Sequence, residues 1–189
     1  MQDFGFYNPT RIEFGKDKEK NIGSYMREFG AKRVLVVYGS DRIKKTGLFD
    51  TAVNSLKAQG IEFTELGGVK SNPVLTKVQE GVKIAKEFKA DSVLAIGGGS
   101  VLDSCKAIAA GAVYDGDVWD FFVKKSADKA LMIFDIITLA ATGSEMNRGG
   151  VVTNEETKEK FGCDGVALFP KVSVINPDLH TPVSKEYLV

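Results

Sequence analysis

The chain has little histidine and little cysteine, and each shortage limits its chemistry. His180 is the only histidine in 189 residues, which excludes paired-histidine catalysis and a multi-histidine metal site within this chain. The two cysteines, Cys105 and Cys163, show neither metal-site spacing nor a disulfide framework. Free thiols are the expectation for a reduced, cytoplasmic protein.

Net charge and long apolar runs are also absent. The 25 basic residues balance the 25 acidic ones, so no nucleic acid or acidic membrane surface is expected as a partner. No apolar run is long enough to span a bilayer, and residues 1–20 lack the core of a signal peptide. The length predicts one domain over residues 1–189, large enough for a real core.

A glycine-rich turn is the most informative feature present. Residues 95–106 read Ala-Ile-Gly-Gly-Gly-Ser-Val-Leu-Asp-Ser-Cys-Lys, which places Gly97, Gly98 and Gly99 between an apolar run and a helix-like stretch. Three glycines allow backbone conformations that a Cβ forbids and let a ligand approach closely. Ser100 is expected to cap the helix, whose first N–H groups attract phosphate. The turn favours a nucleotide site over a plain strand–helix connection.

Four apolar strands alternate with helical segments in the first three quarters of the chain. The strands are predicted at 33–38, 61–66, 91–96 and 130–138, and Asn72-Pro73 is expected to begin the second helix. Apolar strands of this kind predict an α/β, Rossmann-like parallel sheet with helices on both faces. Ligands bind such sheets beyond the carboxyl ends of the strands, where the glycine turn falls.

Two local features interrupt this pattern. Asp135 lies inside an otherwise buried strand, so its carboxylate must reach solvent or find a partner. Residues 149–153 and 171–175 are predicted as short strands around a polar connection at 154–160. We therefore expect a β-hairpin subregion within 148–176.

Two motifs together resemble a known family. The first, GGGSVLDSCK, begins at Gly97, and the second, ATGSEMN, ends at Asn147. In this order they resemble the iron-containing alcohol dehydrogenases, particularly the butanol dehydrogenase branch, over essentially the whole chain. The first motif is shared loosely with glycerol dehydrogenases and dehydroquinate synthases, and the second favours the alcohol dehydrogenases. The resemblance implies a dinucleotide-binding domain of the dehydroquinate synthase-like fold.

The resemblance also implies which residues bind the cofactor. The pyrophosphate is expected beside Gly97, Gly98, Gly99 and Ser100, with Asp103 near the cofactor. The adenosine is expected against Asn72 and Pro73, and Lys160 is expected to contact the cofactor. The residues expected beside the phosphates and the nicotinamide ribose are Thr138, Thr142, Gly143 and Ser144. Each polar residue has a structural alternative. Asp103 would favour the helix dipole without any cofactor, the threonines could be turn hydroxyls, and Lys160 lies among mixed charges that solvate a surface.

The end of the first strand bears on the choice between NAD and NADP. NAD-using relatives often carry an aspartate where this chain has Gly39, because a carboxylate there binds the ribose 2′-hydroxyl and repels a 2′-phosphate. Gly39 and Ser40 leave room and a donor for a phosphate, although Asp41 opposes it. Three nearby cations favour it: Arg42, Lys44 and Lys45. We expect NADP(H) to be favoured over NAD(H).

The metal half of the family pattern is not found in this chain. The resemblance implies Fe²⁺ or Zn²⁺ held by one aspartate and three histidines in a helical carboxyl-terminal domain, and this chain ends before those ligands. His180 matches none of them and is interpreted as a surface residue. Since a metal would activate the alcohol, the chain alone is expected to be inactive, with no catalytic residue of its own.

Three hypotheses about the function remain open. The first is the cofactor half of a dehydrogenase that interconverts small primary alcohols and aldehydes, and the second is a non-catalytic nucleotide-binding module. The third is a fragment of a polyol or glycerol dehydrogenase relative. In each case the apolar face that meets a helical domain would favour a homo-oligomer.

Overall fold

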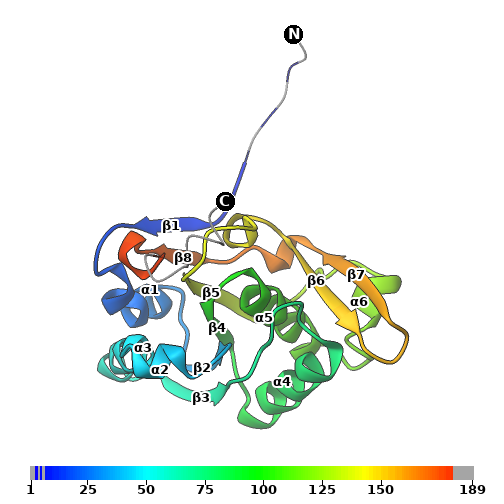
Figure 1. Ribbon diagram of the computed structural model, residues 1–189, viewed down its shortest axis with the longest axis horizontal. Helices are drawn as coiled ribbons and strands as arrows, with labels where there is room; N and C mark the ends of the chain where they lie inside the picture. The colour runs from blue at the N-terminus through cyan, green and yellow to red at the C-terminus, as the bar shows by residue number, and fades with distance from the viewer. Residues whose placement is uncertain (1–2, 4, 6, 181–189) are drawn as a thin grey trace.

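A six-stranded parallel sheet forms the centre of the molecule. The computed structural model describes residues 3, 5 and 7–180. In spatial order the strands are β1 (Arg11–Phe14), β8 (Val172–Ile175), β5 (Met132–Ile137), β4 (Ser92–Gly97), β2 (Arg33–Tyr38) and β3 (Glu62–Leu66). Every neighbouring pair is parallel. The predicted α/β fold is confirmed (Figure 1).

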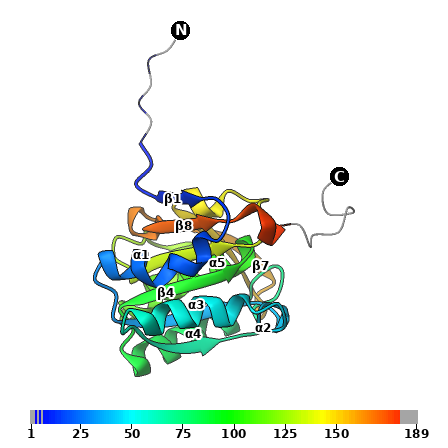
Figure 2. The ribbon, with the colours of Figure 1, turned by 90° about the vertical axis from the view of Figure 1, so that its left-hand side faces the viewer.

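Helices cover both faces of the sheet. One face packs against α1 (Ile22–Glu28) and α3 (Leu48–Ala58), which stand in front of the sheet in Figure 2. The other face packs against α4 (Leu75–Phe88) and α5 (Gly99–Ala112). Within β2, Val34 and Val36 join the first core and Leu35 and Val37 join the second. Both faces of the strand are buried, which explains its uninterrupted apolar sequence.

Shorter elements complete the described chain. They are α2 (Arg42–Lys45), α6 (Asp120–Val123), η1 (Lys18–Asn21), η2 (Ser144–Met146), η3 (Val166–Leu168) and η4 (Pro177–His180). None of the helices in the described part of the chain is long and apolar enough to cross a membrane.

The order of the strands creates a crevice between β2 and β4. The chain leaves β2 for the edge strand β3 and then returns past β2 to form β4 on its other side. At such a switch point the two connections diverge, and ligands bind at the carboxyl ends of the strands between them. Gly39 follows β2 and Gly98 follows β4. The turn singled out in the sequence therefore lies beside this crevice.

The expected hairpin exists, but its second strand was predicted wrongly. β6 (Gly149–Asn154) pairs antiparallel with β7 (Glu159–Asp164), whereas residues 172–175 of the other predicted strand form β8, inside the main sheet. Only Cys163 is buried in β7, so this strand has no apolar pattern to reveal it. β1 was not predicted at all, since its four residues form a short edge strand.

The helix starts differ from the expectation at two places. Asn72-Pro73 does not begin a helix, because Asn72 adopts a left-handed φ of 56° and α4 begins at Leu75. Ser100 does not cap α5, because the helix already begins at Gly99 and Gly98 is its N-cap.

Asp135 finds a partner inside the core, as required. Its carboxyl group is fully buried, and Ser173 Oγ lies 2.6 Å from its Oδ2 and 3.0 Å from the carbonyl oxygen of Glu145. Burial raises the pKa of Asp135 well above its usual value. A protonated Asp135 can donate to Ser173 Oγ, which leaves the serine proton free for the Glu145 carbonyl.

Candidate functional site

Three adjoining clefts form a groove along the carboxyl edge of the sheet. The strand-end cleft, of about 390 Å³, is lined by segments that follow β2, β3, β4 and β5. The hairpin cleft, of about 620 Å³, shares Gly99, Ser100 and Thr142 with it. The apolar cleft, of about 270 Å³, shares Arg42, Ile43 and Thr138 with it. The shared lining residues place the three clefts side by side.

The structure brings the predicted cofactor residues together along this groove. The strand-end cleft and the hairpin cleft are lined by Gly39, Ser40, Asn72, Pro73, Gly97, Gly98, Gly99, Ser100, Asp103, Thr138, Thr142, Ser144 and Lys160. Gly143 lines none of the three clefts and supplies the left-handed turn, with φ of 65°, before η2. Their role in binding a cofactor stays a prediction.

The glycine turn is required for close packing and not for unusual dihedral angles. None of Gly97, Gly98 and Gly99 has a positive φ, contrary to the sequence-based interpretation. A Cβ on Gly97 would lie 2.6 Å from Val101 Cγ2, and one on Gly99 would lie 2.4 Å from Thr142 Oγ1. The segment around Thr142 therefore packs directly onto the first turn of α5. The Val101 and Leu102 N–H groups donate to the Gly98 carbonyl oxygen. The N–H groups of Gly99 and Ser100 precede the first bonds of the helix, and both residues line the strand-end cleft.

Asp103 lies one turn further along α5, in the hairpin cleft. Its Oδ1 accepts a hydrogen bond from Ser144 Oγ at 2.7 Å, and its Oδ2 accepts one from the Val151 N–H at 3.1 Å. Burial raises the pKa of Asp103, and these two hydrogen bonds oppose the rise. The carboxylate thus joins α5 to η2 and to β6.

Lys106 was quoted in the first motif, yet its role was missed. Its side chain is fully buried, and its Nζ donates to oxygens of Ser144, Asn147 and Gly149 at 2.7–3.0 Å. Burial lowers the pKa of Lys106 to about 8. The only signal in the sequence is its place on the buried face of a helix, three residues after Asp103. A lysine is ordinarily interpreted as exposed.

The hairpin is fastened to the segment before α4. Lys160 Nζ donates to Asn72 Oδ1 at 2.8 Å, and the Thr153 N–H donates to the Pro73 carbonyl at 2.8 Å. Glu155 accepts hydrogen bonds from the N–H and the Oγ1 of Thr76 in the first turn of α4. Two segments that the resemblance assigned separately to the cofactor are therefore in direct contact.

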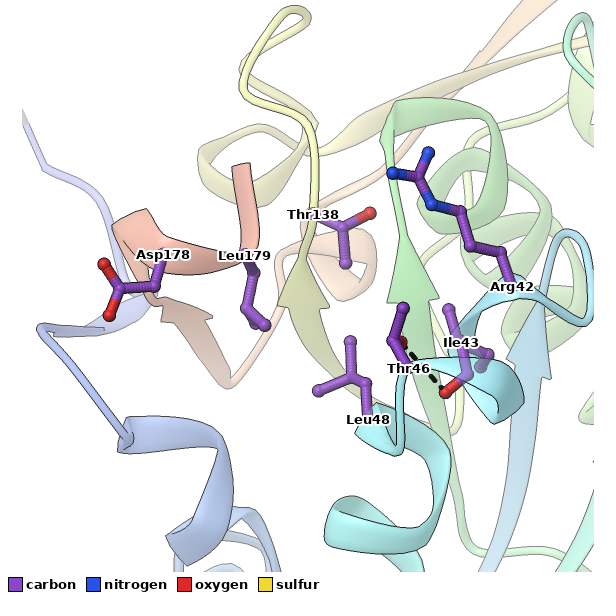
Figure 3. Close-up of a pocket in the computed structure, with 7 residues that line it drawn as sticks. All are labelled: Arg42, Ile43, Thr46, Leu48, Thr138, Asp178 and Leu179. Atoms are coloured by element: carbon purple, nitrogen blue, oxygen red, sulfur yellow. Dashed lines mark hydrogen bonds between the residues drawn. The ribbon is translucent and has the colours of Figure 1, made fainter. Parts of the chain in front are cut away.

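The apolar cleft lies at the other end of the groove (Figure 3). Leu48, Leu179 and Thr138 surround the space, while the Asp178 carboxylate points away from it. His180 follows at the end of η4. Its Nδ1 accepts a hydrogen bond from the Ala140 N–H at 3.2 Å, and the side chain is only partly exposed. His180 is therefore a partly exposed residue that also contacts the backbone of the segment after β5.

Metal-ligating side chains do not gather in the described part of the chain. Within residues 7–180, no three histidine, cysteine, aspartate or glutamate side chains are placed to hold a metal ion. The groove is lined instead by backbone, hydroxyl and amide groups and by apolar side chains, with a few charges.

Comparison with known proteins now assigns the chain to a family. The model of the iron-containing alcohol dehydrogenases matches residues 9–177. The chain belongs to this family. The probable NADH-dependent butanol dehydrogenase 1 of Bacillus subtilis is 46% identical over 190 residues, which cover 100% of this chain and 49% of that protein. NADH-dependent butanol dehydrogenase A of Clostridium acetobutylicum is 46% identical over 186 residues, 98% of this chain and 48% of that protein.

A solved structure agrees with the family assignment. The crystal structure of NADH-dependent butanol dehydrogenase A from Thermotoga maritima superposes with a TM-score of 0.95 at 52% identity, covering 98% of this chain and 47% of that one. The chain thus spans about half the length of the iron-containing alcohol dehydrogenases that it matches.

The expected preference for NADP(H) over NAD(H) was wrong. Four butanol dehydrogenases that are each 46% identical to this chain are named as NADH-dependent or probably so. The structure shows why the cations were misleading. Lys44 forms an ion pair with Glu65 at 2.9 Å, and neither Lys44 nor Lys45 lines the strand-end cleft. Of the three cations, only Arg42 lies beside Gly39 and Ser40.

Proposed function

We propose that this chain is the NAD(H)-binding part of a metal-dependent dehydrogenase that interconverts a primary alcohol and its aldehyde. One observation carries the proposal. The N-terminus of the 14-residue helix α5 opens, through a turn without side chains, onto a groove at the switch point of a parallel sheet. The names of the butanol dehydrogenase relatives support the cofactor and the substrate class.

The residues of the groove fit a dinucleotide. The crowding around Gly97 and Gly99 keeps the turn free of side chains, so an anion can reach the first N–H groups of α5. Gly39 and Ser40 leave room for a ribose, and the adjoining apolar cleft suits a flat base. The cofactor, when bound, supplies the hydride chemistry. The chain's own residues bind it, orient it and shield one side from water.

Among the described residues, no three side chains are placed together to hold a metal ion. We assign to them cofactor binding and not the activation of the alcohol. As one dinucleotide-binding domain they complete only part of the reaction. Self-association and a cytoplasmic location also stay predictions, and light scattering coupled to size exclusion tests the first.

Calorimetric titration of the chain with NADH and with NADPH tests the proposal. We expect micromolar binding of NADH and weaker binding of NADPH. AMP is a useful third ligand because it probes the adenosine end alone. Failure of all three to bind would contradict the proposal, and tighter binding of NADPH would contradict the assigned cofactor.

A further inference from the structure

A buried ammonium group connects the two sides of the hairpin cleft. Lys106 projects from α5, and its Nζ reaches five oxygens on the opposite segment. They are the carbonyl oxygen and Oγ of Ser144, the carbonyl oxygen and Oδ1 of Asn147, and the carbonyl oxygen of Gly149, all within 2.7–3.0 Å. An ammonium has three protons, so some of them are shared. This one cation adds to the hydrogen bonds that segment 144–149 makes within η2 and at the start of β6.

All five contacts are to uncharged oxygens, and the nearby ionisable groups come from four elements. Asp103 lies on α5 itself, Glu145 on η2, Asp135 on β5 and Cys163 on β7. Ser144 Oγ accepts from Lys106 and donates to Asp103 Oδ1. The Ser144 hydroxyl therefore links the Lys106 ammonium to the Asp103 carboxylate, which lines the cleft. A buried cation held by neutral groups is costly unless its hydrogen bonds are satisfied.

The segment held by Lys106 forms one side of the hairpin cleft only. Ser144, Asn147 and Gly149 line that cleft and neither of the other two. Just before this segment, Thr142 packs onto Gly99 at the start of α5. The position of the segment sets the width of the hairpin cleft, while the cleft beside Gly39 is built without it.

We propose that Lys106 is a positioning residue that holds segment 144–149 and the Asp103 carboxylate in the arrangement needed by the nicotinamide half of the cofactor. The inference rests on the proposed function, because it assumes that a dinucleotide occupies the groove with its adenosine end beside Gly39 and its nicotinamide end in the hairpin cleft. This orientation departs from the expectation that Asn72 and Pro73, which line the hairpin cleft, lie against the adenosine. Lys106 does not itself line a cleft. It acts through Ser144 and Asn147, and its removal should affect NADH more than AMP.

The first test compares NADH and AMP binding in three variants. Lys106→Met removes the ammonium, Lys106→Arg keeps a charge, and Lys83→Met is a matched control on the exposed side of α4. In Lys106→Met the Kd for NADH should rise at least about tenfold while that for AMP stays within about twofold, since the lost bonds lie at one end of the groove. Lys106→Arg should recover part of the loss, and Lys83→Met should match the wild type.

The second test measures the pH dependence of NADH affinity and leaves the Lys106 side chain in place. Because burial lowers the pKa of Lys106 to about 8, the wild type should lose NADH affinity several-fold between about pH 7 and pH 9, as the ammonium loses its proton. Lys106→Arg stays charged and should not show this loss. If Lys106→Met does not fold, the pH profiles of NADH affinity in the wild type and in Lys106→Arg test the role of Lys106.

The outcomes separate the inference from the proposed function. Equal loss of NADH and AMP binding in Lys106→Met, no loss at all, or parallel pH profiles in the wild type and Lys106→Arg would each overturn the role of Lys106. The proposed function would survive all three. A wild-type chain that binds no NADH at about pH 7 would overturn both.

Discussion

The two walls of the groove are built in different ways. The inner wall, residues 39–40 and 97–103, follows directly from buried strands and the first turns of a long helix. The outer wall, residues 139–164, consists of a loop, η2 and a two-stranded hairpin outside the main sheet. Its contacts join residues 38, 79 and 88 positions apart. The inner wall is therefore a local product of the sheet. The outer wall depends on long-range polar bonds together with a few apolar contacts, such as those of the buried Val152 and Cys163.

This difference indicates how each wall can fail. Burial of apolar side chains stabilises the inner wall from both faces of the sheet, so a single substitution there should block the ligand before it unfolds the chain. The polar contacts of the outer wall come from Lys106, Lys160 and Glu155. Removing one polar bond there should loosen the wall and leave the sheet intact.

The largest expected effect is the loss of NADH affinity when a side chain is added to the inner wall. Gly98→Val should reduce NADH affinity by at least about three orders of magnitude, or ~4 kcal/mol, because the added atoms occupy the approach to α5. The φ of Gly98, −88°, is open to any residue, and the nearest atom to the new Cβ would be Leu139 Cβ at 3.3 Å. A small shift of Leu139 should therefore be enough for the fold to persist. Calorimetry measures the affinity and circular dichroism the fold.

Gly162→Ala is the matched substitution on the outer wall. A Cβ there meets nothing closer than the Gly150 carbonyl oxygen at 3.8 Å, so NADH affinity should stay within about threefold of the wild type. Similar losses in the two variants would remove the distinction between the walls.

The next effect is the pH dependence of stability that Lys106 imposes. Its pKa is about 8 in the folded chain against 10.5 ordinarily. Between those values the unfolded chain binds more protons, so the free energy of unfolding should rise with pH, by on the order of 3 kcal/mol in total. Lys106→Arg should lack this rise. Urea denaturation from about pH 7 to pH 10 measures both.

The sign of this effect sharpens the inference on Lys106. Stability should increase over a range in which NADH affinity decreases, because the neutral amine suits burial and the charged form suits the cleft. If both quantities change in the same direction, the affinity change follows from unfolding, and the positioning role is contradicted.

A smaller effect is expected where the hairpin joins α4. Glu155→Gln weakens the acceptor for the Thr76 N–H and the charge at a helix N-terminus, which should cost about 0.5–1 kcal/mol of stability. Hydrogen exchange should increase in β6 and β7 first. Glu156→Gln, one residue further and exposed, is the control and should change neither quantity. Faster exchange in β4 instead would show that the hairpin is not the weaker unit.

The smallest effect concerns the discarded preference for NADP(H). Arg42→Ala should weaken NADPH binding about threefold and leave NADH nearly unchanged, since only Arg42 among the three cations lines the strand-end cleft. Lys44→Ala should affect neither cofactor, because Lys44 is engaged with Glu65. Fluorescence titrations with both cofactors provide the comparison. A loss of NADPH affinity in Lys44→Ala would show that the ion pair opens on binding.

The sequence was most informative where structure is local. The strands at 33–38 and 91–96 and the turn after Ile96 were predicted within a residue or two of β2, β4 and the start of α5, since an apolar run that ends in glycines has few alternatives. β7 escaped prediction because five of its six side chains are exposed. Most of the site residues were predicted from the family resemblance and not from their spacing. Asn72 and Lys160, for example, are in contact although they lie 88 residues apart.

The amino-acid sequence by itself determined the parallel sheet, the glycine turn and the place of that turn at the end of a strand. Burial on both faces leaves a periodic apolar pattern that can be recognised without coordinates. Only the tertiary structure decided that Lys106 is buried, that Lys44 forms an ion pair with Glu65 and that β8 lies in the main sheet beside β5. Each depends on contacts between distant segments, whose energies are set by desolvation and geometry and leave no local pattern.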